Sequence, residues 1–291
     1  MTTVAAPLER RKLPAAVRRQ RFLISVAEHS LLIATAIAFL APVVFMALTA
    51  LMTSDQALSS QLWPKTFEWG NFAEVFHKSP LLTWTLNTMI YAGLATLGVV
   101  VSSIPVAYAL SRLRWKGRDA VFLVVLVALM LPPQVAVVPL YVMWAKLGLI
   151  GTLWPLIIPV WFGDAFAIFL LRQFFLTVPE EYLDAARVDG CGEFRILTTV
   201  VVRLTKPAIA AVALFSVLYC FNDFFLPLLY VGENPDNWVV SIVLSQFRSA
   251  HQVQWNLVMA ATLLVMLPVI VLFFLAQRAF VEGVTLTGVK G

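Results

Sequence analysis

Charge is the first thing that this sequence lacks. Only 13% of its 291 residues are Asp, Glu, Lys or Arg, whereas 60% are hydrophobic. A soluble domain of this size carries roughly a quarter charged residues. The composition therefore excludes an ordinary water-soluble protein and indicates an integral membrane protein.

Cysteine and histidine are also scarce. Cys191 and Cys220 fall in a polar loop and in a hydrophobic stretch, so we expect no disulfide framework. His29, His77 and His251 lie far apart and do not have the spacing of metal ligands. We therefore expect no metal site in this chain.

The sequence also lacks a phosphate-binding loop of the Gly-x-x-x-x-Gly-Lys-Ser/Thr type. Gly283 and Gly288 have the required separation, but Val289 stands where the lysine is needed. No cluster of His, Asp and Ser residues indicates a membrane enzyme. We expect neither a nucleotide site nor a catalytic site.

Long apolar stretches take the place of these features. A helix that crosses the hydrocarbon core of a bilayer needs about 20 apolar residues. Six stretches qualify: Leu31–Met52, Leu82–Leu110, Ala120–Ala145, Leu153–Leu171, Pro207–Tyr230 and Leu257–Gln277. We predict an all-α fold with six transmembrane helices over residues 31–280, preceded by a basic arm (1–30) and followed by a short tail (281–291).

The basic residues predict an orientation for these helices. Of the 21 Lys and Arg residues, only Lys65, Lys78, Lys146 and Arg248 fall outside the arm, the loop after the second span, the region from Arg172 to Lys206, and the C-terminal end from Arg278 onward. The positive-inside rule places that majority, and both termini, in the cytoplasm. The net charge of +5 therefore indicates a membrane topology and contact of the arm with solvent or lipid, not nucleic-acid binding.

A polar segment, residues 177–206, separates the fourth and fifth predicted spans. Thr177 and Glu180 have the spacing of a capping box, and Pro179 suits the first turn of a helix. Gly190 and Gly192 are expected to end that helix in a tight turn, where glycine adopts positive φ without cost. The segment is thus predicted to form a helix, a glycine turn and a second helix.

Two interpretations of the first helix remain open from its pattern alone. It is either a contact that docks in a groove of a cytoplasmic partner, or an ordinary loop helix stabilised by surface charges, such as Arg187 pairing with Glu181 or Asp184. Under the first interpretation, small and acidic residues form the contact. They are Glu181, Asp184, Ala185, Ala186, Asp189 and Gly190.

Polar residues inside the predicted spans form a second candidate site. An acid at the bilayer centre costs roughly 2.5–3.5 kcal/mol, so such residues usually face protein or water. Asp223, with Asn222 beside it, either lines a substrate pathway, bonds to a neighbouring helix or caps a helix at a break before Pro227. Asp164 either lines the pathway or caps a half-helix. Asn87 and Gln134 are further candidates, although polar side chains also join helices.

The polar segment resembles a known motif. Asp184-Ala185-Ala186, followed by Gly190, is similar to the Glu-Ala-Ala loop of ABC importer permeases, with Asp184 in the place of the usual Glu. The second half of that motif ends in Ile-x-Leu-Pro, and here it is degenerate. Arg203 stands where the proline is expected, and Pro207 follows four residues later.

Other stretches resemble the carbohydrate-uptake, or maltose-type, branch of the same permeases. They are Asn87-Thr88, Ala107–Arg112, Pro132 to Tyr141, Leu171–Phe175, Asn222-Asp223 and the ending Gly288-Val289-Lys290-Gly291. Together with the polar segment, these stretches occur in the order typical of that branch, and the resemblance covers nearly all of the chain from Trp63 to Gly291.

The resemblance implies a heteromeric importer in a bacterial or archaeal inner membrane. This chain would be one permease subunit, working with a second permease subunit, a cytoplasmic ATPase dimer that binds ATP and Mg²⁺, and an extracytoplasmic solute-binding protein. Transport of sugars or sugar-like solutes by alternating access is the expected function. The rival expectation is a secondary carrier or channel that works without ATPase subunits.

Overall fold

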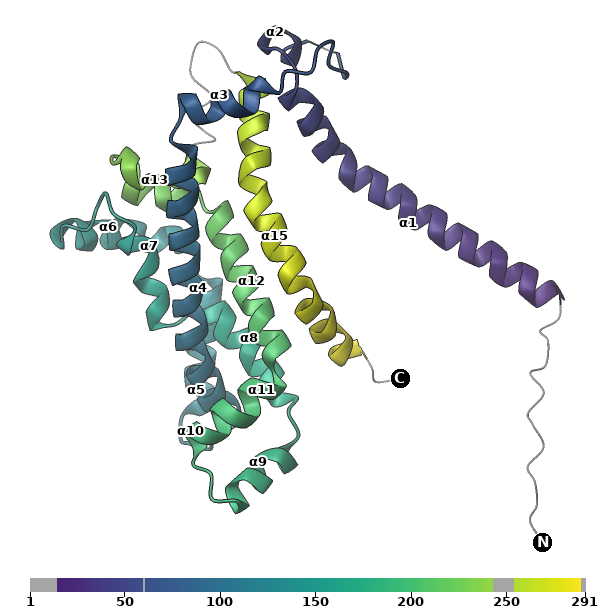
Figure 1. Ribbon diagram of the computed structural model, residues 1–291. Coiled ribbons are helices and arrows are strands. Elements are labelled where there is room, and N and C mark those ends of the chain that lie inside the picture. Colours follow the sequence, from purple (N-terminus) through teal and green to yellow (C-terminus); the bar gives the residue numbers. More distant parts are fainter. Residues whose placement is uncertain (1–14, 60, 243–253, 289–291) are drawn as a thin grey trace.

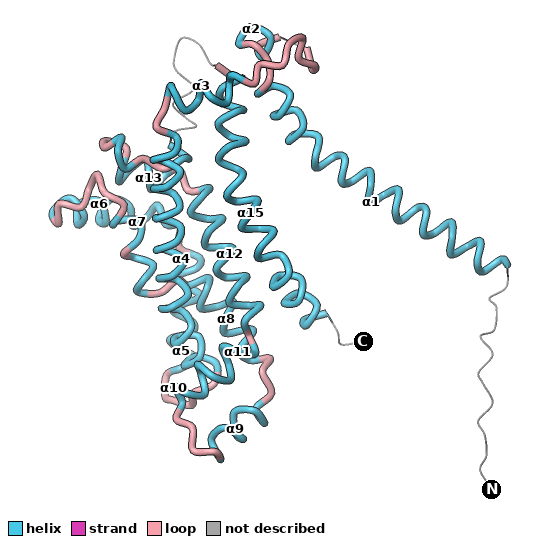
Figure 2. The backbone as a smooth tube through the Cα atoms, in the orientation of Figure 1, coloured by secondary structure: helices cyan, strands magenta, loops and turns pink. Residues whose placement is uncertain are grey.

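The computed structural model describes residues 15–59, 61–242 and 254–288, and every regular element in these ranges is a helix (Figure 2). Four helices are long and apolar enough to cross a membrane: Phe22–Ala50, Leu81–Ser111, Trp154–Leu176 and Trp255–Leu275. Two pairs of helices that meet at a sharp bend also qualify when each pair is counted as one span. They are Arg118–Met130 with Pro133–Lys146, and Glu193–Leu204 with Lys206–Asn222. The described part of the chain therefore has four candidate spans, or up to six if each bent pair is one span.

Helix α1 (Ala15–Ala50) leans away from the other helices (Figure 1). In the most apolar stretch of α1 no residue is buried. Helix α1 contacts α15 (Trp255–Gly288) near the C-terminal end of α1, where Ala50 is buried. Helical structure thus begins inside the predicted basic arm and continues into the predicted tail. Residues 1–14 and 289–291 of these two segments lie outside the described ranges.

Helix α4 (Leu81–Ser111) lies at the centre of the bundle and packs against α8 (Ala165–Leu176) and α12 (Lys206–Asn222). Close approach depends on Gly98 of α4, which lies under the Trp161 ring of the short helix η2 (Pro159–Phe162). A Cβ atom at Gly98 would be 2.5 Å from Trp161 Cδ1. Any larger residue at position 98 would therefore require the Trp161 ring to move.

The third and fourth predicted spans are broken. Helix α5 (Arg118–Met130) is followed by η1 (Pro133–Ala136) and α6 (Val137–Lys146), with a bend of 91° at consecutive prolines. The fourth span consists of α7 (Trp154–Ile157), η2 and α8, with Gly163 at a φ of 120° before α8.

The polar segment lies at one end of the bundle and contains α9 (Glu180–Val188), α10 (Glu193–Ile196), the π-helical η3 (Leu197–Val201) and α11 (Val202–Leu204). The chain then bends by 80° into α12, which has Pro207 in its first turn. Arg203 stays helical, so the chain turns beside Pro207 and not at the place where the resemblance puts a proline.

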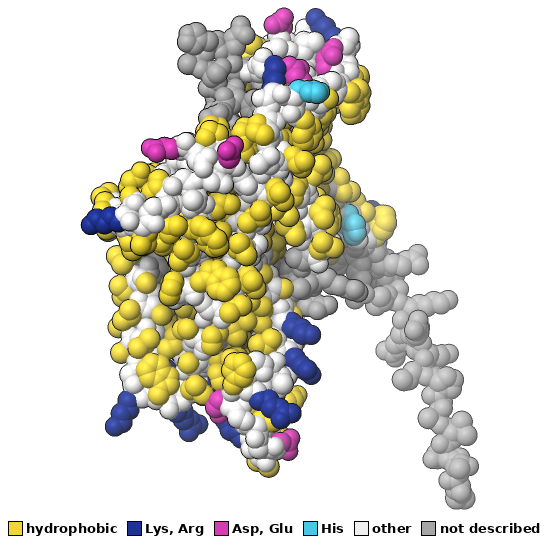
Figure 3. All heavy atoms as spheres, turned by 60° about the vertical axis from the view of Figure 1, so that its left-hand side comes forward, with side chains coloured by type: hydrophobic (Ala, Val, Ile, Leu, Met, Phe, Trp, Pro, Cys, Tyr) yellow, Lys and Arg dark blue, Asp and Glu magenta, His cyan; other side chains and the backbone are white. Residues whose placement is uncertain are grey.

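The remaining described elements are α2 (Ser54–Ala57), α3 (Gly70–Lys78), α13 (Phe225–Val231) and η4 (Pro235–Asn237), and they gather at the opposite end (Figure 1). Figure 3 shows hydrophobic side chains over the middle of the molecule and Lys and Arg collected at the end that carries α9. This separation is what a bilayer-spanning protein requires, because charged side chains stay outside the hydrocarbon core.

Candidate functional site

One buried leucine fastens α9 to the bundle. The side chain of Leu183 is fully buried and belongs to a hydrophobic cluster with Phe175 of α8, Ile196 of α10 and Leu197 of η3. Burial of a leucine side chain contributes about 1.5–3 kcal/mol. The apolar side of α9 is therefore a point of attachment, and its other sides are left for polar contacts.

The start of α9 differs from the prediction. The capping box is wrong, because Pro179 is the N-cap residue and supplies no side-chain cap, while the Thr177 hydroxyl donates to the Phe174 carbonyl at 2.7 Å. Thr177 thus completes the end of α8. The Glu180 carboxylate does not reach back to cap the helix but accepts from Arg112 of α4 at 3.2 Å.

The turn after α9 agrees with the prediction at one glycine only. Gly190 has a φ of 77°, so it adopts the left-handed conformation that glycine favours. Gly192 has a φ of −72° and is the N-cap residue of α10, so positive φ at this position is wrong. One glycine suffices to reverse the chain, and the next residues already extend toward α10.

Arg112, at the C-terminal end of α4, clamps the entrance to the polar segment. Its side chain is only 7% exposed. Nε donates to the Phe175 carbonyl at 2.9 Å, and Nη2 donates to the carbonyls of Phe175 and Val178. Nη1 pairs with Glu180. A cation thus lies against carbonyls at the end of α8, and positive charge is what a helix C-terminus favours.

A second arginine links the two helices of the polar segment. Arg187 Nη1 pairs with Asp184 at 2.9 Å, which confirms that predicted partner, and its Nε pairs with Glu193 of α10 at 3.0 Å. The Tyr108 hydroxyl of α4 donates to the other oxygen of Glu193. Asp184, Arg187 and Glu193 border a hollow of about 410 Å³ between the end of α4 and the polar segment.

The hydrogen bonds to Glu193 change the acidity of the groups involved. Donation from the Tyr108 hydroxyl, and then from Arg187, holds the pKa of the Glu193 carboxyl below its usual range. The hydrogen bond to Glu193 in turn raises the pKa of the Arg187 guanidinium. Both groups are therefore charged at neutral pH, and the link between α4, α9 and α10 is an ionic one.

The outer side of α9 is open to contact. Five of the six predicted contact residues are exposed: Glu181, Asp184, Ala185, Asp189 and Gly190. Ala186 is half-buried and packs against the hydrophobic cluster, so it faces inward. Val188 and Phe194 are 88% and 79% exposed, and the sequence prediction missed both. The only available signal was their apolar character within a polar segment.

The two acids inside the predicted spans are located at helix breaks. Asp164 is the N-cap residue of α8, and its Oδ1 accepts from the Ala167 amide at 2.7 Å, as the capping alternative predicts. Asp223 lies between α12 and α13. It accepts from the Tyr91 hydroxyl of α4 at 3.3 Å and from the Leu226 amide at 3.4 Å.

The three polar candidates have different surroundings. The Asn87 amide donates to the carbonyls of Asp236 and Trp238 at 2.7 and 3.0 Å, which joins α4 to the chain around η4. Asn222 is exposed at the end of α12, in line with the exposed Phe215 and Tyr219. Gln134 is exposed on η1, in a different part of the structure. The structure therefore brings Asn222 and Asp223 together and leaves Gln134 apart.

Membrane-length helices, with a short charged helix held by two arginines at one end, define a membrane permease component. The chain belongs to the family of binding-protein-dependent transport system inner membrane components, whose model matches residues 98–286. It is therefore an inner-membrane transport component of an importer, not an enzyme.

Individual relatives cover most of the chain. It is 34% identical over 230 residues to the arabinooligosaccharides transport system permease protein AraQ of Halalkalibacterium halodurans, covering 78% of this chain and 81% of that protein. It is 32% identical over 264 residues to the sn-glycerol-3-phosphate transport system permease protein UgpE of Yersinia pestis, covering 88% and 94%.

A solved structure has the same fold. The chain matches a subunit of a bacterial ABC transporter involved in the import of the acidic polysaccharide alginate, with a TM-score of 0.77 and 21% sequence identity. The match covers 90% of this chain and 98% of that subunit. The two chains therefore share an arrangement of helices over nearly their whole length.

Proposed function

We propose that this permease subunit imports sugars or sugar-like solutes, and that α9 is the helix through which a cytoplasmic ATPase dimer drives it. One observation carries the proposal: α9 is tied to α4 by Arg112, Arg187 and Tyr108, yet it leaves Ala185 and Val188 exposed. A helix fixed on one side and open on the other transmits a push from a partner to the bundle.

The proposed topology has six spans, with both termini and the polar segment in the cytoplasm. It takes α5 with η1 and α6 as one span and α12, which follows the bend after the polar segment, as another, and it is supported by the collection of Lys and Arg at the α9 end. In this topology residues 31–280 form the permease domain. ATP and Mg²⁺ are then bound by the ATPase subunits, which lie on the same side of the membrane as α9.

The proposed partners of the subunit are assigned to parts of its surface that are exposed in the structure. The apolar helix α1 has no buried residue in its most apolar window, so lipid and a second permease subunit are proposed to cover it. A solute-binding protein is proposed to deliver substrate at the end that carries α2, α3 and α13. The family's printed description, which names dependence on a binding protein, supports this partner.

The substrate pathway is proposed to pass the break between α12 and α13. Asn222 is exposed there beside Asp223, and an exposed amide within a span is stable only if it faces water, substrate or protein. The names of the relatives, which concern arabinooligosaccharides and sn-glycerol-3-phosphate, support a polyhydroxylated substrate. In this proposal Asp164 and Asn87 shape the helices around the pathway, and Gln134 lies at a more distant part of it.

The test replaces Ala185 with arginine. Because Ala185 is exposed, Ala185→Arg is expected to leave folding intact while it prevents the ATPase from binding and abolishes uptake. Ala73→Arg is the matched control for ATPase binding alone, because Ala73 is also exposed but lies on α3 at the opposite end, where the solute-binding protein is proposed to dock. The readouts are co-purification of the ATPase subunits and ATP hydrolysis by the assembled complex.

Two results would overturn the proposal. If Ala185→Arg retains full ATPase binding and uptake, α9 is not the driving contact. If vesicles that contain only permease subunits accumulate substrate on an ion gradient, the chain works as a secondary carrier.

A further inference from the structure

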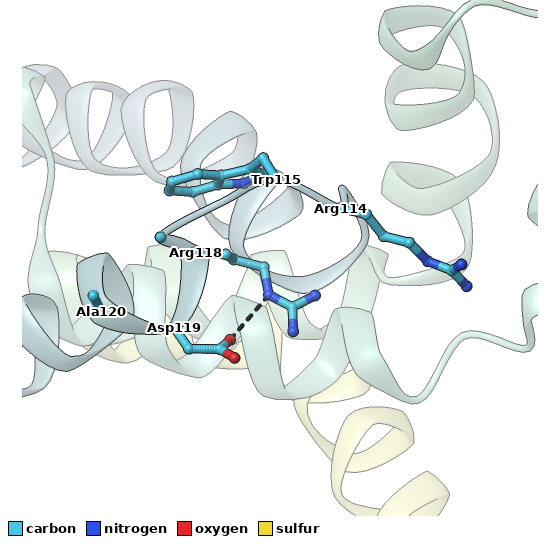
Figure 4. Close-up of a pocket in the computed structure, with 6 residues that line it drawn as sticks. Arg114, Trp115, Arg118, Asp119 and Ala120 are labelled. Carbon is cyan, nitrogen blue, oxygen red and sulfur yellow. Dashed lines mark hydrogen bonds and ion pairs between the residues drawn. The ribbon is translucent and has the colours of Figure 1, made fainter.

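The turn between α4 and α5 forms a basic hollow at the α9 end of the molecule. The hollow has a volume of about 290 Å³ and is lined by Arg114, Trp115, Gly117, Arg118, Asp119 and Ala120 (Figure 4). Gly117 has a φ of 92°, which turns the chain from α4 into α5. Figure 4 shows the guanidinium groups of Arg114 and Arg118 extending from this turn in the same direction.

The charges around the hollow do not cancel. Arg118 Nε pairs with Asp119 at 3.0 Å, but Asp119 is 80% exposed, so this ion pair is screened by solvent. Arg118 also lies within electrostatic range of Arg172 of α8, a like charge. Arg114 has no protein acceptor among the described residues. Three arginines thus share one solvated carboxylate.

The neighbouring acids are already engaged. Arg114 also borders the larger hollow at α9, where Glu180 pairs with Arg112, and both Asp184 and Glu193 pair with Arg187. Arg172 is held in place, because its Nε donates to the Leu110 carbonyl at 3.1 Å and its guanidinium lies over the Phe122 ring. Around the turn, Arg114, Arg118 and Arg172 therefore outnumber Asp119, and protein contacts hold Arg118 and Arg172 in place.

An apolar surface begins directly beside the cluster. Trp115 is 41% exposed, and its Nε1 donates to the Ala109 carbonyl at 3.0 Å, which holds the ring next to the hollow. Along α5, exposed valines follow at intervals of three residues: Val121, Val124 and Val127. A cationic site that continues into an exposed apolar helix face matches an amphiphile, whereas a free anion would use only the cationic part.

We propose that this hollow binds the phosphate of an anionic phospholipid, with one acyl chain along the valines of α5. Arginine suits the role because its planar guanidinium donates two parallel hydrogen bonds to phosphate oxygens. Basic hollows between helices at the cytoplasmic surface are where anionic headgroups are attracted. The lipid supplies the missing counter-charge and covers the turn between α4 and α5.

The test measures lipid binding to the full chain in detergent micelles by native mass spectrometry and thermal shift. Phosphatidylglycerol, phosphatidylcholine and inorganic phosphate are the three probes. The double variant Arg114→Gln with Arg118→Gln is expected to bind phosphatidylglycerol roughly 25-fold more weakly, since each basic residue contributes about fivefold. The control Arg195→Gln with Arg203→Gln removes the same charge from exposed positions of the polar segment and is expected to change binding less than about twofold.

Asp119→Asn gives a test that does not depend on losing arginines. Removal of the opposing carboxylate is expected to strengthen phosphatidylglycerol binding by about fivefold, by the same estimate. The proposal is overturned if phosphatidylcholine binds equally well, if the control pair weakens binding as much as the arginine pair, or if Asp119→Asn has no effect. Equal thermal stabilisation by inorganic phosphate would identify an anion site and reject the lipid.

Discussion

The hydroxyl of Tyr108, near the end of α4, donates a hydrogen bond to the carboxylate of Glu193 in α10. The two residues are 85 positions apart, and α4 is not one of the helices that flank the polar segment in sequence. Arg112, one turn further along α4, holds Glu180 of α9. Helix α4 is therefore attached to the start of α9 through Glu180 and to α10, which follows the turn, through Glu193.

The Tyr108–Glu193 hydrogen bond predicts an energetic interaction between these residues. In a double-mutant cycle with Tyr108→Phe and Glu193→Gln, we expect an interaction free energy of about 1 kcal/mol, because Glu193 is partly exposed to solvent. Thermal unfolding of the full chain in detergent micelles measures it. Additive effects of the two substitutions would contradict the link.

Arg112→Gln is expected to have a larger effect. The side chain is nearly buried and donates to the Phe175 and Val178 carbonyls as well as to Glu180, so its loss removes all of these hydrogen bonds of a cation from a largely buried position. We expect a loss of about 2–4 kcal/mol and release of α9 from α4. Hydrogen exchange of residues 176–190 measures this. Arg114→Gln is the control, because Arg114 is exposed and lies two residues away.

Gly190→Ala tests the turn. A Cβ at Gly190 would have no atom within 4 Å, so the cost comes from its φ of 77° and not from crowding. We expect a loss of about 1–2 kcal/mol. Gly192→Ala is the matched control, since it also has open space but an ordinary φ. Equal effects of the two substitutions would show that the backbone conformation is not the reason for glycine at 190.

Gly98→Ala tests the contact between α4 and η2. The added methyl group would lie 2.5 Å from the Trp161 ring, and such overpacking costs about 1–3 kcal/mol. Gly93→Ala, on the same helix with nothing within 4 Å, is expected to be neutral or stabilising by about 0.5–1 kcal/mol. Tryptophan fluorescence and thermal unfolding distinguish the two variants. A stable Gly98→Ala protein would show that Trp161 moves aside easily.

Acid is expected to loosen the polar segment. Because its hydrogen bonds lower the pKa of Glu193 in the folded state, the carboxylate stabilises the fold above the ordinary glutamate pKa of about 4.3. That stability is lost as the pH falls through the lowered value. Hydrogen exchange of residues 180–196, corrected for its intrinsic pH dependence, is expected to rise over this range in the wild type, and to rise less in Glu193→Gln. Identical pH profiles for the two proteins would rule out Glu193 as the group responsible.

Much of this arrangement is predictable from sequence because the bilayer restricts it strongly. Residues that form long apolar runs, such as Leu82–Leu110, have few alternatives to a helix, and α4 matches that run within one residue at each end. Gly190 was predictable for a local reason, since a polar helix that ends before a glycine typically turns there. The pairing of Arg187 with Asp184 is also local.

The long-range contacts were not predictable. Nothing in the sequence around Thr177 shows that its hydroxyl turns back to α8, because the alternative cap is chemically equivalent. The link between Tyr108 and Glu193 depends on how α4 meets α10 in space. Ala185 and Ala186 look alike as sequence, and only the packing shows that one faces outward and the other inward.

The separation of α1 from the other helices has a consequence for the life of the subunit before it meets its partners. Along its most apolar stretch α1 buries none of its residues against the rest of the described structure, so in a newly inserted chain this stretch lies against lipid. The position of α1 in the membrane then depends on the packing at Ala50 and on the molecules that later pack along the helix. An isolated subunit therefore differs from one in which α1 is covered as proposed by a long apolar helix that lies unpacked in the membrane.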